Sequence, residues 1–236
     1  MDAQERYSRH LLLKEIGEVG QEKIRQAKVL VIGAGGLGSP ILLYLAAAGI
    51  GTLGVMDDDV VSTSNLQRQI LYDTLSLGKP KVEVACRKLQ ALNPDCRIIP
   101  MAKRLTAGNA NEITGNFDIV VDATDNLLSR YIINDACVEN GKPFVYGSIC
   151  EFEGQVSVFN YKGGPTYRDL YPYHEEVPSF QQPSGVIGAL PGTVGSIQAS
   201  ETIKIILGSQ HTLSGKLLLI NLLEGSFRTI QLSKGK

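Results

Sequence analysis

The four cysteines of this 236-residue sequence are widely spaced, and none of them forms a C-x-x-C pair. Zinc knuckles and most disulfide frameworks need closely spaced cysteines, so the sequence predicts neither. We interpret Cys86, Cys96, Cys137 and Cys150 as small buried hydrophobic side chains without a catalytic role.

An excess of charge of one sign is also absent. The sequence has 23 lysines and arginines against 24 aspartates and glutamates, for a net charge of −1. Because nucleic-acid-binding domains normally carry a basic patch or stripe, we expect no nucleic-acid partner.

Long hydrophobic runs are missing as well. The longest apolar stretches, such as Ile41 to Ala48 and Lys216 to Leu223, are well below the roughly 20 residues of a membrane-spanning helix. The charged residues Met1 to Arg6 are followed by no apolar signal-peptide core. We therefore expect a cytoplasmic protein without a membrane partner. Its 43% of hydrophobic residues suffices for one large core.

Strand and helix patterns alternate along the first 150 residues. Lys28 to Ile32 is a β-branched run that ends at a glycine, apolar residues from Leu37 to Leu45 then repeat at helical spacing, and Thr52 to Met56 is the next strand. This alternation predicts an α/β fold with a mostly parallel, Rossmann-like sheet and helices on both faces. The further predicted elements are helices at 81–92, 107–113 and 126–140 and strands at 97–101, 117–121 and 143–148.

The pattern changes after Cys150. Residues 155–159 alternate in the manner of an antiparallel strand, 191–207 form a helix, and 216–220 with 226–232 form a hairpin. We expect antiparallel strands toward the C-terminal end. The segment from Tyr161 to Leu190 has no clear periodicity, and loops of that length are usually functional or mobile.

A glycine-rich turn joins the first predicted strand to the first helix of this alternation. Gly33, Gly35, Gly36 and Gly38 match G-x-G-x-x-G, and Asp57 follows the last glycine by 19 residues. This arrangement is typical of a nucleotide whose phosphates bind at a helix N-terminus and whose ribose binds the acid. The motif alone does not distinguish NAD from ATP.

Cations and amides follow the acidic strand end. Asn65, Arg68 and Gln69 stand in NLQRQ, and Lys81 opens the next helix. Transfer of a nucleotidyl group needs such groups near the phosphates, whereas hydride transfer needs a nicotinamide pocket instead. The alternative is that Arg68 and Lys81 are ordinary solvated surface cations.

One acidic residue at a later strand end has two possible roles. Asp125, in the sequence DATDN, follows the strand predicted at 117–121, where open α/β sheets bind ligands. It is placed to hold Mg²⁺ on a triphosphate, or to cap the helix that begins near Leu127.

Several motifs occur in a fixed order along nearly the whole chain: GAGGLG, the acidic strand end, NLQRQ, GKPK, DATDN and GVIGALPGTVGSIQASETIK. This ordered set resembles the ThiF/MoeB/HesA family of ubiquitin-activating-type enzymes. The resemblance implies use of ATP and Mg²⁺ to transfer AMP to the C-terminal Gly-Gly of a small ubiquitin-like sulfur-carrier protein, with release of pyrophosphate. Such carriers serve thiamin thiazole or molybdopterin biosynthesis, with a cysteine desulfurase as a possible sulfur donor.

The same resemblance assigns roles to residues. It places Asp57 and Asp59 on the ribose and nucleotide side and makes Asp125 the metal-linked carboxylate. It implies a homodimer in which Arg9 reaches the partner's active site, although Arg9 by itself reads as an exposed helical residue. The residues placed around the phosphates are Asn65, Arg68, Gln69 and Lys81.

The whole chain, 1–236, is expected to form a single adenylation domain. Its parts are an N-terminal helical segment at 1–27, a nucleotide-binding core at 28–150 and a carrier-binding C-terminal part at 151–236.

The sequence departs from the family pattern in two places. Residues 166–169 read TYRD where many members carry C-x-x-C, so we expect no structural zinc, and the 161–190 segment must be held otherwise or be mobile. Residues 179–184 contain no cysteine where some members have one, so the resemblance does not extend to a thioester there.

Two rival interpretations remain open. One is an NAD-dependent oxidoreductase on the same fold, against which the NLQRQ and GKPK segments speak. The other is a non-catalytic dimeric binding protein that has kept the nucleotide pocket, against which the cations near it speak.

Overall fold

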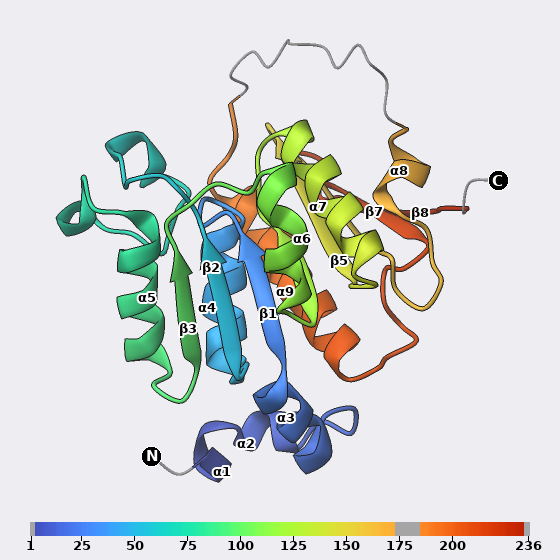
Figure 1. The fold of residues 1–236 in the computed structure, drawn as a ribbon, viewed down its shortest axis with the longest axis horizontal. Coiled ribbons are helices and arrows are strands. Elements are labelled where there is room, and N and C mark those ends of the chain that lie inside the picture. The colour runs from blue at the N-terminus through green and yellow to red at the C-terminus, as the bar shows by residue number, and fades with distance from the viewer. Residues whose placement is uncertain (1–2, 173–184, 234–236) are drawn as a thin grey trace.

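A single mixed sheet organises the structure, a computed structural model that describes residues 3–172 and 185–233 (Figure 1). Within those residues the sheet has eight strands in the order β3-β2-β1-β4-β5-β6-β7-β8. The strands are β1 Lys28–Ile32, β2 Thr52–Met56, β3 Arg97–Met101, β4 Ile119–Asp122, β5 Phe144–Cys150, β6 Glu153–Phe159, β7 Lys216–Asn221 and β8 Ser226–Gln231. The stretch from 179 to 184 lies outside the described residues.

The sheet is parallel at one end and antiparallel at the other. β1 pairs with β2 and β4 in parallel, so that Val31 lies beside both Val55 and Val121. β5 joins β4 in parallel, and β6, β7 and β8 then follow as antiparallel neighbours. Parallel strands covered on both faces carry continuous apolar runs, which the buried residues from Val29 to Ile32 illustrate. The prediction of a Rossmann-like α/β fold with antiparallel strands near the end is confirmed.

Helices cover both faces of the sheet. Those described are α1 Ala3–Arg6, α2 Ser8–Leu11, α3 Gly17–Gln26, α4 Gly38–Ala48, α5 Lys81–Leu92, α6 Ala107–Gly115, α7 Leu127–Glu139, α8 Tyr167–Leu170 and α9 Ala189–Ile206, with short 3-10 turns η1 Thr63–Asn65 and η2 Thr74–Ser76. The helix predicted at 81–92 has those ends in α5, whereas the ends of α6, α7 and α9 differ from the predicted ends by one or two residues.

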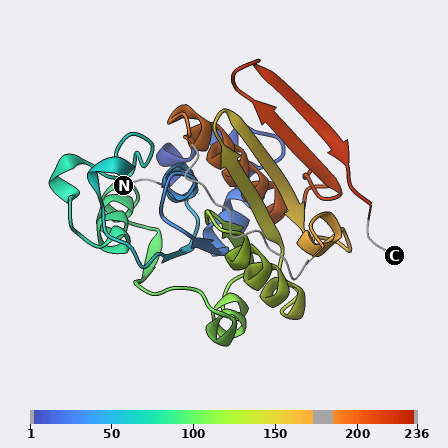
Figure 2. The same cartoon turned by 90° about the horizontal axis from the view of Figure 1, so that it is seen from above.

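The two faces carry separate hydrophobic layers. One layer packs the sheet against α4, α5 and α9 and includes Ile41, Leu89 and Val194. The other packs it against α6 and α7 and includes Ile113 and Ile133. Figure 2 shows α6 and α7 on the opposite side of the sheet from α9.

The cysteines follow the prediction only in part. Cys96 and Cys137 are buried and Cys86 is half-buried, as expected for small core side chains. Cys150 is exposed, so the prediction that it is buried was wrong. It is the last residue of β5 and pairs with Glu153 where the chain turns into β6, and the burial of β5 decreases toward this end.

The N-terminal helices lie at the amino end of β1 (Figure 1). Tyr7 anchors them, because its buried hydroxyl accepts a hydrogen bond from Asn93 Nδ2 at 2.9 Å. Gln21 Nε2 in α3 also donates to the Ala48 carbonyl at 2.9 Å. These bonds fix the helices at the edge of the sheet opposite to the carboxyl ends of its parallel strands.

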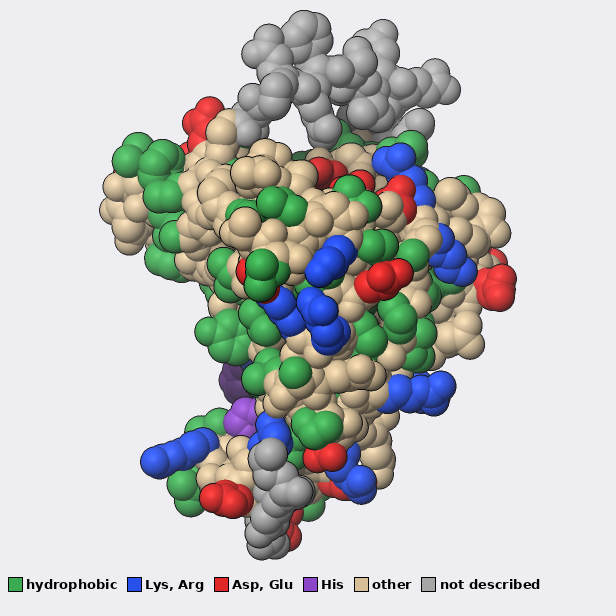
Figure 3. All heavy atoms as spheres, turned by 90° about the vertical axis from the view of Figure 1, so that its left-hand side faces the viewer, with side chains coloured by type: hydrophobic (Ala, Val, Ile, Leu, Met, Phe, Trp, Pro, Cys, Tyr) green, Lys and Arg blue, Asp and Glu red, His purple; other side chains and the backbone are tan. Residues whose placement is uncertain are grey.

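Two features of the described residues bear on possible partners: the hydrophobic length of the helices and the distribution of charge on one face. No helix within 3–172 and 185–233 is long and apolar enough to cross a bilayer. On the face over α5 and the neighbouring turns, basic and acidic side chains are interspersed (Figure 3).

Helix α8 occupies the place where the family resemblance would put a C-x-x-C pair. Tyr167 is fully buried there and packs at ring-centroid distances of 5.1 to 6.1 Å. Its aromatic neighbours are Tyr131, Phe144, Tyr146, Phe159 and Tyr171. Arg168 also forms a two-point ion pair with Asp135, at 2.7 and 2.6 Å. Up to Pro172, the segment is therefore held by packing and an ion pair.

These two anchors should differ in strength. Tyr167→Ala is expected to lower the free energy of unfolding by about 3–5 kcal/mol, because it empties a buried aromatic site. Arg168→Ala should cost only about 1–2 kcal/mol, because its partly exposed ion pair with Asp135 and its contact over the Tyr131 ring each contribute about 1 kcal/mol or less. Denaturant unfolding of the two variants measures the difference, and equal losses would show that the aromatic packing is not the main anchor.

Candidate active site

The predicted site residues converge at the carboxyl ends of the parallel strands. The glycine loop follows β1, Asp57 follows β2, and the segment from Ala123 to Asn126 follows β4. These ends lie side by side at one edge of the sheet because β1 stands between β2 and β4 (Figure 1). Open α/β sheets bind their ligands at such an edge.

The glycine loop owes its shape to close backbone contacts. Gly33 has a φ of +98°, and a Cβ there would lie 2.4 Å from the Ala123 carbonyl oxygen. A Cβ on Gly38 would lie 2.1 Å from the Gly33 carbonyl oxygen. Only glycine fits both positions, and the loop is thereby pressed against the segment that leads to Asp125.

The other two motif glycines border on side chains that the sequence predicts for the site. A Cβ on Gly35 would lie 3.4 Å from Gln69 Nε2, and one on Gly36 would lie 3.6 Å from Arg68 Cγ. The loop then runs into α4, which begins at Gly38, and the start of a helix is a favourable place for an anion. The backbone at Gly35 and Gly36 therefore lies directly against these two polar side chains.

Asp57 binds the glycine loop directly. Its Oδ2 accepts the Ala34 N–H at 2.7 Å, and its Oδ1 accepts the Asp59 N–H at 2.9 Å. Asp57 thus links the end of β2 to the loop after β1. This explains how the predicted ribose-side carboxylate is held next to the predicted phosphate site.

Lys81 is the most buried cation of the site. Its side chain is 5% exposed, and its Nζ lies 2.9 Å from Asp59 Oδ2 and 3.8 Å from Asp57 Oδ1. A long charged side chain is rarely buried unless it is paired. The alternative of a solvated surface cation is therefore wrong for Lys81.

The remaining NLQRQ residues lie at the same edge and differ in their burial and hydrogen bonding. Gln69 is buried, and its Oε1 has no hydrogen-bond partner among the residues that the structure describes. Arg68 is half-buried and donates through Nη1 to the Ser64 carbonyl at 3.0 Å. Asn65 Oδ1 accepts the Ser62 N–H at 3.3 Å, which closes the capping box of η1.

Asp125 is exposed at the tip of the loop after β4. The N-cap of α7 is Asn126, whose side chain accepts the Ser129 N–H at 2.9 Å. The alternative that Asp125 caps this helix was therefore wrong, because the residue directly before the helix is Asn126. Among the described residues, the carboxylates of Asp57, Asp58 and Asp59 form a second acidic group, within 4.8 Å of one another.

Arg9 lies apart from the other predicted site residues. It is exposed on α2, which lies at the opposite edge of the sheet (Figure 1). Within one chain it is remote from the glycine loop, so a role for Arg9 in this site requires a second copy.

Tyr72 is a site residue that the sequence did not indicate. Its buried hydroxyl donates to the Ala34 carbonyl at 2.7 Å, so the Ala34 residue is bound on one side by Tyr72 and on the other by Asp57. Burial and the nearby Asp57 and Asp59 carboxylates raise the pKa of Tyr72, which keeps it a donor at any physiological pH. It ends an apolar I-L-Y run, which offers no signal of this contact.

Tyr72→Phe should loosen the glycine loop without emptying space. The Ala34 carbonyl would lose its donor in a buried place, so the free energy of unfolding should fall by about 1–3 kcal/mol. Denaturant unfolding measures this change, and Tyr44→Phe on the exposed face of α4 is the matched control. Equal stabilities of the two variants would contradict the assigned bond.

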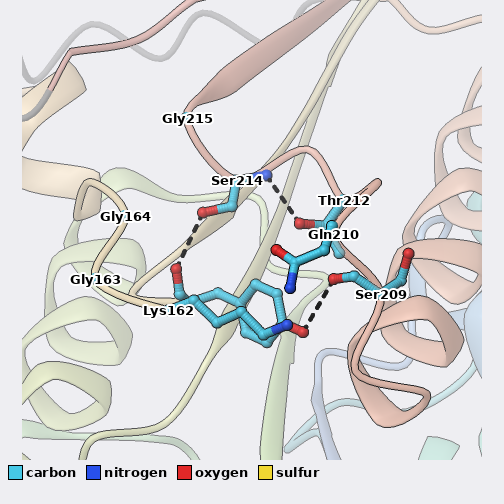
Figure 4. Close-up of a pocket in the computed structure, with 9 residues that line it drawn as sticks. Lys162, Gly163, Gly164, Ser209, Gln210, Thr212, Ser214 and Gly215 are labelled. Atoms are coloured by element: carbon cyan, nitrogen blue, oxygen red, sulfur yellow. Dashed lines mark hydrogen bonds between the residues drawn. The ribbon is translucent and has the colours of Figure 1, made fainter.

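A polar pocket elsewhere contains none of the predicted residues. It has a volume of about 290 Å³ and lies between the loop after β6 and the loop after α9 (Figure 4). Its polar groups bond across the two loops: Lys162 Nζ donates to the Gly208 carbonyl at 2.8 Å, and Ser214 Oγ to the Tyr161 carbonyl at 3.2 Å. The pocket therefore does not compete with the glycine-loop edge as the candidate site.

Comparison with known proteins agrees with this placement. A sulfur carrier protein adenylyltransferase of Thermus thermophilus is 48% identical over 234 residues, which is 96% of this chain and 86% of that protein. A probable molybdopterin-synthase adenylyltransferase of Porphyra purpurea is 48% identical over 233 residues, 96% of this chain but 60% of that protein. The chain thus spans less than two thirds of the Porphyra relative. Both names support the prediction of an adenylyltransferase enzyme.

A solved structure supports the fold independently. The crystal structure of E. coli MccB with MccA-N7isoASN matches with a TM-score of 0.89 at 21% identity, covering 100% of this chain and 73% of that one. The model of the ThiF family matches residues 7–236. With this match over nearly its whole length, the chain belongs to the ThiF family.

Proposed function

We propose that this chain is an ATP-dependent adenylyltransferase that activates the C-terminal Gly-Gly carboxylate of a small ubiquitin-like sulfur-carrier protein, with release of pyrophosphate. The names of its relatives support a carrier for molybdopterin synthase or a related sulfur carrier. A thiamin thiazole carrier is the other candidate. A cysteine desulfurase is a candidate donor of the sulfur that follows activation.

The observation that carries this proposal is the buried Lys81 ammonium beside the glycine loop. A cation held by two carboxylates at 2.9 and 3.8 Å has a defined position before the substrate arrives. Preorganised charge of this kind stabilises a transferring phosphoryl group. An NAD-dependent oxidoreductase has no need of such a cation at its phosphate loop.

The chemistry requires little beyond positioning. The carrier carboxylate is ionised at neutral pH, so it attacks the α-phosphate without a general base. A new bond forms between a carboxylate oxygen and the α-phosphorus, and the bond from that phosphorus to the bridging oxygen of pyrophosphate breaks. We assign Lys81 and Arg68 to the negative charge of the phosphates, and Asn65 and Gln69 to their orientation.

Three carboxylates complete the nucleotide site. Asp57 and Asp59 are proposed to face the ribose, and Asp125 is proposed to hold Mg²⁺ with the ATP. The exposed Asp125 carboxylate offers the oxygen ligands that Mg²⁺ prefers, which usually come from one or two carboxylates and the substrate phosphates. When bound, Mg²⁺ supplies positive charge that offsets the charge of the triphosphate.

A homodimer accounts for Arg9. Because α2 lies at the edge of the sheet opposite to the glycine loop, Arg9 is proposed to act in the site of a second copy. Leu12 and Leu13, in the turn between α2 and α3, and Val19 in α3 are exposed by 77%, 50% and 73%. Exposed apolar side chains grouped in this way support a contact surface.

The continuous sheet from β3 to β8 supports one adenylation domain over the whole chain. Its proposed parts are the N-terminal helical segment 1–27, the nucleotide-binding core 28–150 and the carrier-binding part 151–236. A cytoplasmic location fits a carrier and a sulfur donor that are themselves soluble proteins.

Mass spectrometry of the carrier tests the proposal. After incubation with the enzyme, ATP and Mg²⁺, the carrier should gain the mass of one AMP, and a carrier that lacks its last two glycines should not. ATP binding without any AMP transfer would favour the non-catalytic binding protein. Binding of NAD in place of ATP would favour the oxidoreductase.

A further inference from the structure

A buried ion pair lies directly behind the loop that carries Asp125. Asp122 is the last residue of β4 and is fully buried, and Arg130 in the first turns of α7 is 8% exposed. Arg130 Nε lies 3.3 Å from Asp122 Oδ2. The Asp122 carboxylate and the Arg130 guanidinium are engaged with each other and with Thr124, so we look for their effect on the reaction in the residues that they hold.

Both partners bind the residue that precedes Asp125. Asp122 Oδ1 accepts the Thr124 N–H at 2.8 Å and the Thr124 hydroxyl at 2.6 Å. Arg130 Nη2 donates to the Thr124 carbonyl at 3.2 Å. The backbone of Thr124 is therefore fixed at its N–H, its carbonyl and its side chain.

The strand end itself is held from the other face of the sheet. Gln198 of α9 is buried, and its Nε2 donates to the Asp122 carbonyl at 2.7 Å. The guanidinium of Arg130 also lies over the Tyr146 ring, 5.5 Å from its centroid. The ion pair therefore cannot shift as a unit without breaking contacts on both faces.

A buried ion pair such as Asp122–Arg130 contributes little net stability to a fold. Burial raises the pKa of the Asp122 carboxyl, and the Arg130 guanidinium acts against that rise. Removing two charges from water costs several kcal/mol per ion, and an apolar pair of similar volume is often as stable. A buried ion pair is thus weak evidence of a stabilising role, whereas its bonds to Thr124 have an evident geometric effect.

We propose that Asp122 and Arg130 are positioning residues that fix the Thr124 backbone and so present the Asp125 carboxylate to the magnesium ion of bound ATP. This inference rests on the proposed function. Residues that orient a metal ligand typically contribute about 10- to 100-fold to metal affinity or activity. The effect should appear in nucleotide binding only when Mg²⁺ is present.

Binding calorimetry with ATP, in Mg²⁺ and in EDTA, tests the proposal. Arg130→Lys keeps the charge but cannot reach both Asp122 and Thr124, and it should weaken binding of ATP with Mg²⁺ by about tenfold or more. Binding of ATP in EDTA should stay within about twofold, because the glycine loop and Lys81 are untouched. Equal losses under both conditions would mean that the pair only supports the fold.

A second pair of variants, at Thr124, tests the proposal even if Arg130→Lys does not fold. Thr124→Val loses the hydroxyl bond to Asp122 and should show the same Mg²⁺-specific loss, whereas Thr124→Ser keeps the bond and should bind as the native protein does. Identical Mg²⁺ dependence of Thr124→Val and Thr124→Ser would overturn the inference while leaving the proposed function intact. A native protein that binds no ATP in either condition would overturn the proposed function and, with it, this inference.

Discussion

Replacing Lys81 with methionine is expected to lower the rate of ATP–pyrophosphate exchange by about 10²–10³-fold, the usual effect of removing one preorganised charge-stabilising group. The side chain is buried and its ammonium is held between Asp57 and Asp59, so no neighbouring lysine can replace it. Methionine keeps the length of the apolar stem and removes only the charge. The exchange assay, run with the carrier at saturating ATP, measures the loss.

A nearby lysine supplies the control for this experiment. Lys79 is exposed and lies two positions before Lys81, so Lys79→Met removes the same charge without entering the site. Its exchange rate should stay within about threefold of the native rate, because exposed charges interact weakly in water. Equal losses in the two variants would point to a general charge effect and contradict the role of Lys81.

Asp125→Asn should reduce exchange by a similar factor, about 10²–10³-fold, and should also weaken the dependence on Mg²⁺. The amide keeps the shape of the side chain but is a poorer ligand for a hard cation than a carboxylate. Asn126 caps α7, so the substitution should leave the helix and the stability of the fold unchanged. A titration of the exchange rate with Mg²⁺ measures both effects.

The exposed Asp95 provides the matched substitution, since it lies in the turn between α5 and β3. Asp95→Asn should leave the Mg²⁺ titration unchanged. If Asp125→Asn exchanged at the native rate with an unchanged Mg²⁺ requirement, the metal site would have to be placed elsewhere, with the carboxylates of Asp57 to Asp59 as the next candidates.

The fold was predictable because local patterns and the global topology agree. A strand such as Val29 to Ile32 is apolar on both faces, which in a βαβ context indicates a parallel strand covered by helices. The switch to alternation at 155–159 likewise indicated the antiparallel strands. The short α8 was not predicted, because its place is decided by the packing of Tyr167 against rings that are distant in sequence.

The grouping of the candidate-site residues was predictable where a residue stands in a recognisable spacing. The glycines and Lys81 are of this kind, and the structure brings them to one edge of the sheet. Tyr72 was not predictable, because its role depends on a bond to the Ala34 carbonyl, 38 residues away in the sequence. Arg130 was not predictable either, because its role depends on contacts with Asp122 and Thr124 that form only in the folded loop. The cap of α7 was also not predictable, because Asp125 and Asn126 are adjacent polar residues and either could occupy the N-cap position, which Asn126 occupies.

The most direct test of the proposed function is ATP–pyrophosphate exchange with each candidate ubiquitin-like carrier from the same genome, in the presence of Mg²⁺. Adenylylation of a carrier tail predicts exchange that requires one carrier, requires its terminal Gly-Gly, and is lost in Arg68→Ala. Absence of exchange with every carrier, from a folded protein that binds ATP, would contradict the account and leave another carboxylate substrate or a binding role.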